Sequence, residues 1–133
     1  MSLVLDTSVL IAIQKKNGNI IKKLSELSKV YPLPPQLTFI SYFEFLYGLK
    51  KRKPKRYDDA LAFLNNFNVL HTTNNSAEIL SELKLKYDGE GIVLSLADLM
   101  IASQVIENNL MLVTLDKDFK KISELKKIIL ELG

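Results

Sequence analysis

Short apolar runs that alternate with helical patterns constrain the fold of this chain more than any other feature. The runs carry almost no polar residues, and they occupy residues 3–5, 37–40, 69–70 and 110–113. Strands that are buried on both faces of a sheet have this near-continuous apolar character, and the helices between them cover both faces. We therefore predict an α/β fold, namely a three-layer α/β/α sandwich with a central parallel sheet of four to five strands.

Helical periodicity fills the segments between the runs. Apolar spacing and the Pro and Gly punctuation predict helices over residues 7–14, 20–30, 41–53, 57–67, 74–87 and 95–108. The hydroxyls that we expect to cap helices belong to Thr7 with Ser8, to Ser41 and to Ser95. The tail is ambiguous, and we favour a helical turn near Ser123 and a last strand over residues 128–130.

Gly48 lies inside the predicted helix over residues 41–53. An interior glycine costs a helix about 1 kcal/mol relative to alanine. The sequence therefore predicts close packing of Gly48 against another backbone, either within the chain or across a dimer.

Length and composition indicate a single domain over residues 1–133, because 47% apolar residues can fill one layered core. The absence of cysteine excludes disulfides, thiolate zinc sites and a cysteine nucleophile, and the lone His71 excludes a multi-histidine metal site. The apolar start is interrupted by Asp6 and has no cationic flank, so it predicts neither a signal peptide nor a membrane span. We expect a cytoplasmic protein with no membrane partner.

One cationic run carries the basic character of the chain. The net charge is +3, and six of the 18 Lys and Arg residues fall within residues 50–56. The other twelve cations are outnumbered by the 15 acids of the chain. A local basic patch beside an acidic cluster suits an enzyme that acts on phosphodiesters. The alternative is a solvated helix end, where cations are favoured. The candidate phosphate contacts are Lys50, Lys51, Arg52, Lys53, Lys55 and Arg56.

Four carboxylates stand at predicted junctions between strands and helices: Asp6, Glu44, Asp98 and Asp116. In a parallel sheet these junctions lie at the carboxyl edge, so the four acids are expected to converge on one crevice. There they repel one another unless a cation lies between them. Hard divalent ions such as Mg²⁺ or Mn²⁺ prefer oxygen ligands, and the pattern therefore predicts a shared metal site.

Each acid also has a structural explanation. Glu44 follows Ser41 in an S-x-x-E capping box, and Asp98 follows Ser95 in a variant of it. Asp6 can cap a helix, and Asp116 can be an ordinary loop acid. The joint pattern favours the metal site, because Asp98 occupies the apolar stripe of its own helix, where an unpaired carboxylate is costly.

The motifs resemble those of a known family. Residues 5–11 (LDTSVLI), residues 41–44 (SYFE) with Gly48, residues 98–102 (DLMIA) and residues 114–119 (TLDKDF) resemble the ordered motifs of PIN-domain ribonucleases. They are similar in particular to VapC-type toxins of prokaryotic toxin–antitoxin pairs. The resemblance covers essentially the whole chain.

This resemblance implies a Mg²⁺- or Mn²⁺-dependent endoribonuclease that acts on an RNA substrate. It also implies a homodimer that is held inactive by a small antitoxin whose tail reaches the active site. The matching residues form three groups: the acidic quartet of Asp6, Glu44, Asp98 and Asp116; the hydroxyls of Thr7, Ser8 and Thr114, which orient ligands; and Asp118, a further candidate ligand.

Such a site would bind one or two ions and direct water at a phosphodiester, with any of the acids as general base. A haloacid-dehalogenase-like phosphatase fits poorly, since it needs a second Asp where this chain has Ser8. A receiver-like domain fits poorly too, because residues 71–73 hold no acid. The remaining alternatives are a PIN-like module that binds RNA or protein without cleavage, and a PIN nuclease of RNA processing or decay.

Overall fold

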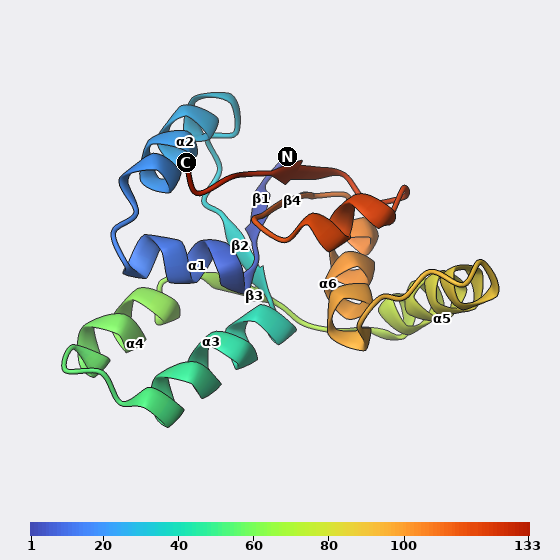
Figure 1. The fold of residues 1–133 in the computed structure, drawn as a ribbon, viewed down its shortest axis with the longest axis horizontal. Helices are drawn as coiled ribbons and strands as arrows, with labels where there is room; N and C mark the ends of the chain where they lie inside the picture. Colours follow the sequence, from blue (N-terminus) through green and yellow to red (C-terminus); the bar gives the residue numbers. More distant parts are fainter.

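A single five-stranded sheet organises the computed structural model, which describes all 133 residues (Figure 1). All strand pairings are parallel, and the spatial order is β3-β2-β1-β4-β5. The strands are β1 (Leu3–Leu5), β2 (Gln36–Thr38), β3 (Asn68–Leu70), β4 (Met111–Thr114) and β5 (Lys127–Ile129). The predicted parallel sheet of four to five strands is confirmed.

Helices cover both faces of this sheet. In Figure 1, α1, α2 and α4 lie to the left of the strands, α3 lies below them, and α5 and α6 lie to the right. The bounds are α1 (Thr7–Gln14), α2 (Gly18–Val30), α3 (Phe39–Arg52), α4 (Tyr57–Asn65), α5 (Asn74–Gly89) and α6 (Leu96–Glu107), with a 3₁₀ helix, η1, over Lys117–Lys121. No helix combines the length and the apolar character that crossing a membrane requires.

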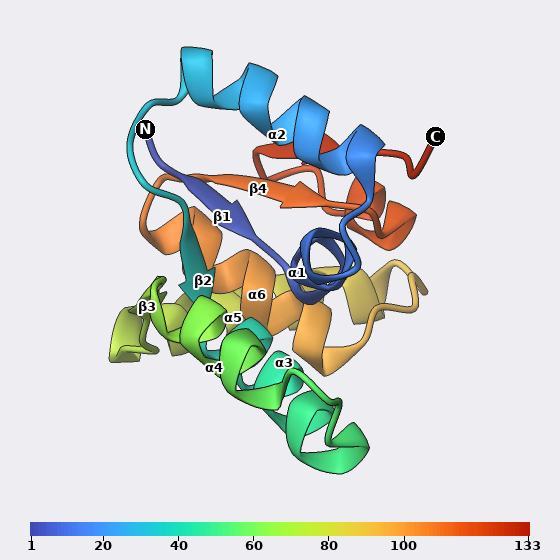
Figure 2. The same cartoon turned by 90° about the vertical axis from the view of Figure 1, so that its left-hand side faces the viewer.

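Two hydrophobic cores result from the alternation of side chains along the strands. Leu3 and Leu5 of β1 join the core shared with α1 and α3, whereas Val4 joins the core shared with α5 and α6. The central strand β1 is therefore buried on both faces, as its apolar run predicts. It leads directly into α1 at its carboxyl end (Figure 2).

The junction of β2 and α3 differs from the prediction. The strand ends at Thr38 and the helix begins at Phe39, so the predicted strand over residues 37–40 is too long. Thr38 is the N-cap, because its Oγ1 accepts a hydrogen bond from the backbone N–H of Ser41 at 3.2 Å. The predicted cap at Ser41 is therefore wrong. Glu44 consequently lies in the second turn of α3, and no capping box joins it to Ser41.

Other boundaries shift as well. Asp6, not Thr7 or Ser8, caps α1. Asn17 caps α2, which begins at Gly18, two residues before its predicted start. The helix α4 ends at Asn65, and the helical turn of the tail lies at Lys117–Lys121, earlier than Ser123. The last strand, Lys127–Ile129, begins and ends one residue before the predicted one.

Gly48 does not pack closely against any backbone within the chain. A Cβ placed on Gly48 would meet only the guanidinium of Arg52, at 3.3 Å from Nη2. That part of the prediction is wrong, and packing of Gly48 across a dimer stays a prediction.

The cap of α3 can be tested by truncating its two hydroxyls separately. Thr38→Ala should lower the free energy of unfolding by about 1 kcal/mol, since it leaves a buried N–H of the first turn without its acceptor. Thr38→Ser keeps the hydroxyl and should lose less. Ser41→Ala, measured in the same denaturant titration, should also lose less; a larger loss for Ser41→Ala would contradict the assignment of Thr38 as the cap.

Candidate functional site

Asp6 is a buried carboxylate that joins the ends of β1 and β4. It is only 5% exposed. Its Oδ1 accepts hydrogen bonds from the hydroxyl of Ser8 and from the backbone N–H of Val9 at 3.3 Å, and its Oδ2 accepts one from the hydroxyl of Thr114. Burial raises the pKa of Asp6, and the charge of Asp116 adds to this, while the three hydrogen bonds act in the opposite direction.

Two of the predicted ligand-orienting hydroxyls also bind the chain that follows β4. Ser8 accepts a hydrogen bond from the N–H of Leu115 at 3.1 Å, and Thr114 accepts one from the N–H of Asp116 at 2.9 Å. Each hydroxyl therefore donates to Asp6 and accepts from the loop after β4. This network fixes the direction of the backbone on which Asp116 lies.

Three other acids gather beside Asp6. Carboxylate oxygens of Asp98, Asp116 and Asp118 all lie within 4.8 Å of one another. Asp116 comes from the end of β4, and it holds the N–H of Asp118 at 2.9 Å. Asp98 lies in the first turn of α6, whose predicted cap Ser95 is present and accepts from the N–H of Asp98 at 3.1 Å. Because α6 runs back toward the start of β4, its first turn lies at the same edge of the sheet as the strand ends.

The crowding of negative charge raises the pKa of Asp98. Partial burial, together with the charges of Asp116, Asp118 and Asp6, raises the pKa of Asp98 from 3.8 to about 6. One cation moderates the cluster, since Lys121 lies 3.2 Å from Asp118. No salt bridge neutralises Asp6, Glu44, Asp98 or Asp116.

Glu44 stands apart from this group of acids. It accepts a hydrogen bond from the hydroxyl of Thr7 at 2.8 Å, so that it borders the site through the first residue of α1. Among the sequence candidates, the structure thus groups Asp118 with Asp98 and Asp116 and places Glu44 to one side. Helical spacing alone could not show this, because Asp118 reaches the cluster through the tight 3₁₀ turn of η1.

The donor set fits a hard divalent cation. Carboxylate oxygens of Asp98, Asp116 and Asp118 are close enough together to bind one ion. Of these three acids, only Asp118 has a cationic partner. Mg²⁺ and Mn²⁺ prefer such oxygen ligands, and a bound cation would offset the repulsion that raises the pKa of Asp98.

The cationic run lies farther along α3. Lys50, Lys51 and Arg52 form the last turn of that helix, and Lys53 ends it in the left-handed conformation with φ 46°. All four are exposed. At 1.5 Å per residue, the end of α3 lies about 12 Å beyond Glu44.

The chain belongs to the PIN domain family. The family model matches residues 3–125, which is most of the sequence. The structure agrees with this family, since its parallel sheet carries a cluster of carboxylates at its carboxyl edge.

Individual relatives extend the comparison. The chain is 29% identical over 129 residues to Ribonuclease VapC2 of Rickettsia felis, which covers 94% of this chain and 95% of that protein. It is similar to the crystal structure of VapBC2 from Rickettsia felis bound to a promoter DNA fragment, with a TM-score of 0.82, 26% identity and coverage of 98% and 100%. VapBC-1 from nontypeable Haemophilus influenzae has the same fold, with a TM-score of 0.76, 22% identity and coverage of 97% and 98%. The resemblance to PIN-domain ribonucleases, and to VapC-type toxins in particular, is confirmed.

The raised pKa of Asp98 predicts that the stability of the protein depends on pH. A carboxyl whose pKa is raised in the folded state binds more protons there than in the unfolded state, so stability falls as the pH rises from 3.8 to about 6 and stays lower above that range. Without metal and above this range, Asp98→Asn should therefore raise the free energy of unfolding. The expected gain is about 1 kcal/mol, after allowance for the solvent screening of a half-exposed group.

Denaturant titrations at several pH values in EDTA measure this gain, which should vanish below the ordinary pKa of 3.8. Added Mg²⁺ or Mn²⁺ should raise the melting temperature of the wild type more than that of Asp98→Asn. Glu82→Gln, an exposed change on α5, is the matched control and should alter neither quantity. Equal stability of Asp98→Asn and wild type at every pH would contradict the repulsion.

Proposed function

We propose that this chain is a metal-dependent endoribonuclease that hydrolyses RNA phosphodiesters, and that it is the toxin of a toxin–antitoxin pair. The observation that carries the proposal is the group of Asp98, Asp116 and Asp118 beside the buried Asp6, at the carboxyl edge of a PIN-domain sheet. The similarity to a protein named Ribonuclease VapC2 supports the activity.

The proposed catalytic group comprises Asp6, Glu44, Asp98 and Asp116, with Asp118 as a further metal ligand. One or two Mg²⁺ or Mn²⁺ ions would supply positive charge to offset the charge that builds up on the phosphate and would make water a better nucleophile. The chain itself holds the acids in place. Ser8 and Thr114 fix the orientation of Asp6, and Thr7 fixes that of Glu44.

RNA contacts are proposed for the cationic run after Glu44. Its members are Lys50, Lys51, Arg52, Lys53, Lys55 and Arg56, and all are exposed. Exposed cations of this kind supply the sequence-independent part of RNA binding, which weakens with added salt.

A small antitoxin is the proposed protein partner. The solved relatives include VapBC complexes from Rickettsia felis and from Haemophilus influenzae, and a further match is a toxin–antitoxin complex from Klebsiella pneumoniae. We propose that the protein acts in the cytoplasm, where its RNA substrate would be found.

A second copy of the chain is the proposed partner of α3. Three aromatic residues recur at helical spacing on its outer face: Phe39, Phe43 and Tyr47 are 46%, 51% and 56% exposed. The rings of Phe43 and Tyr47 stack with centroids 6.0 Å apart. An exposed aromatic stripe of this kind is typical of an interaction surface, and it is continuous with Glu44 on the same helix.

Cleavage of total cellular RNA tests the activity directly. Purified protein in Mg²⁺ or Mn²⁺ should produce discrete fragments, and EDTA should abolish them. Asp116→Asn keeps an acceptor for the N–H of Asp118 yet should lower the rate by more than about 100-fold, since even the partners of metal ligands typically contribute about 10- to 100-fold. Asp88→Asn, on the distant α5, is the control and should cleave normally. Full activity of Asp116→Asn would rule out the assignment, and metal binding without cleavage would favour the non-cleaving module.

The proposed dimer surface predicts a change of mass in solution. Phe43→Glu introduces a charge in the middle of the aromatic stripe, so it should convert a dimer into a monomer in light scattering after size exclusion. Leu85→Glu removes an even more exposed apolar residue from α5 and should leave the mass unchanged. A wild-type protein that is monomeric at high concentration would overturn this surface.

A further inference from the structure

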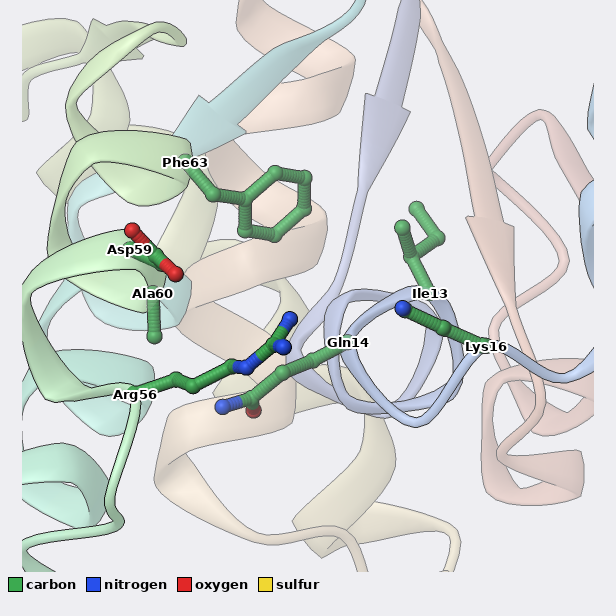
Figure 3. A pocket seen from close by; sticks show the side chains of 7 residues that line it. All are labelled: Ile13, Gln14, Lys16, Arg56, Asp59, Ala60 and Phe63. Atoms are coloured by element: carbon green, nitrogen blue, oxygen red, sulfur yellow. The ribbon is translucent and has the colours of Figure 1, made fainter.

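A pocket between the end of α1 and the start of α4 gathers two cations that are 40 residues apart in the sequence (Figure 3). Its volume is about 250 Å³. Its apolar walls come from Ile13 and Phe63, and its polar lining comes from Gln14, Lys16, Arg56 and Asp59.

The two cations approach each other without an anionic partner. In Figure 3, Lys16 and Arg56 extend toward one another from opposite walls of the pocket. Neither forms a salt bridge with any residue of the chain, although Asp59 lines the same pocket. Like charges that converge in this way are favoured when an anion lies between them, and a guanidinium beside an ammonium is a common pair for phosphate.

The backbone of Lys16 adds a second observation. Its φ is +57°, a left-handed conformation that Gly and Asn adopt readily and that other residues rarely adopt. Lys16 follows Lys15, the C-cap of α1, and ends the helix as Lys53 ends α3, since its N–H bonds back to the carbonyl of Ile13. The turn leaves Lys16 in the lining of the pocket.

The pocket lies one helix length from the acids. The helix α1 begins at Thr7, beside Asp6 and Glu44, and ends at Gln14 in the wall of the pocket. A rise of 1.5 Å per residue puts the pocket about 10 Å from the carboxylates along this helix. This separation is short enough for one RNA strand to contact both places.

We propose that this pocket binds a backbone phosphate of the RNA strand adjoining the phosphate that is cleaved, through Lys16 and Arg56. The proposal rests on the proposed nuclease function and goes beyond it, because it adds Lys16 to the RNA contacts and separates Arg56 from the rest of the cationic run. The earlier part of that run borders a different pocket, which is lined by Lys50, Lys53 and Tyr57.

The remaining lining favours a nucleotide over an acidic peptide. The ring of Phe63 offers a stacking surface for a base, and Asp59 offers an acceptor for a ribose hydroxyl. An acidic peptide would use the two cations but would leave the ring of Phe63 and the acceptor of Asp59 without a matching group. The net charge of the lining is +1, which is enough for one phosphate and too little for a run of carboxylates.

Salt-dependent RNA binding tests the pocket. The probe is fluorescein-labelled oligouridylate in EDTA, so that no cleavage interferes, and the readout is the slope of log affinity against log salt concentration. Lys16→Asn and Arg56→Gln should each reduce this slope by about 0.7, the value for one lost phosphate contact on a single strand. Asn is compatible with the left-handed backbone at position 16, so the melting temperature of that variant should not fall.

Lys16→Arg keeps the charge and should keep the slope. Lys22→Gln removes another exposed charge, on α2, and is the matched control, with no change in slope expected. A slope for Lys16→Asn and Arg56→Gln that equals that of Lys22→Gln would overturn the proposal. Displacement of the probe by oligoglutamate as readily as by unlabelled oligouridylate would assign the pocket to acidic peptides and would also overturn it.

The pocket and the activity can fail separately. If both slopes fall as expected while total RNA stays intact in Mg²⁺ or Mn²⁺, the pocket is supported and the nuclease function is contradicted. If RNA is cleaved but the slopes do not change, the nuclease function stands and the pocket is overturned.

Discussion

The hydrogen bonds around the buried carboxylate of Asp6 are the interaction on which the rest of the site depends. Asp6 ends the central strand β1, caps α1 through the N–H of Val9 and receives the hydroxyls of Ser8 and Thr114. A buried carboxylate is costly without such partners. Because the same hydroxyls hold the loop after β4, one carboxylate sets the positions of two strand ends and of the acids that follow them.

The site keeps more negative charge than the fold alone requires. Burial and neighbouring acids raise the pKa of both Asp6 and Asp98, which means that the ionised cluster opposes folding. Local features that break the rules of stable folding tend to lie at functional sites. Capping of α1 by Asp6 does not explain this excess of charge. The N-cap of a helix needs one acceptor, whereas this edge of the sheet holds several acids that repel one another.

Sequence patterns predicted the sheet well and the cluster only in part. The apolar runs located β1 and β4 because both are buried on both faces, and that signal does not depend on tertiary detail. The junction of β2 and α3 was misplaced because Phe39 looks like a core residue but is 46% exposed on α3. The choice between the hydroxyls of Thr38 and Ser41 depends on backbone direction, which periodicity does not contain. The sequence does not predict a role for Lys16 for a similar reason, since its relation to Arg56 arises only when α4 packs near α1.

The position of Glu44 links the site to the outer surface of the molecule. Its hydrogen bond with Thr7 is the contact that ties α3 to the first turn of α1 near the acids. Phe43, the next residue toward the start of the helix, belongs to the exposed aromatic stripe, so the two faces of α3 cannot move independently. A second copy that covered Phe43 and Tyr47 would restrain the helix that carries Glu44. In the proposed dimer, assembly would then help to set the distance between Glu44 and the acids at the strand ends.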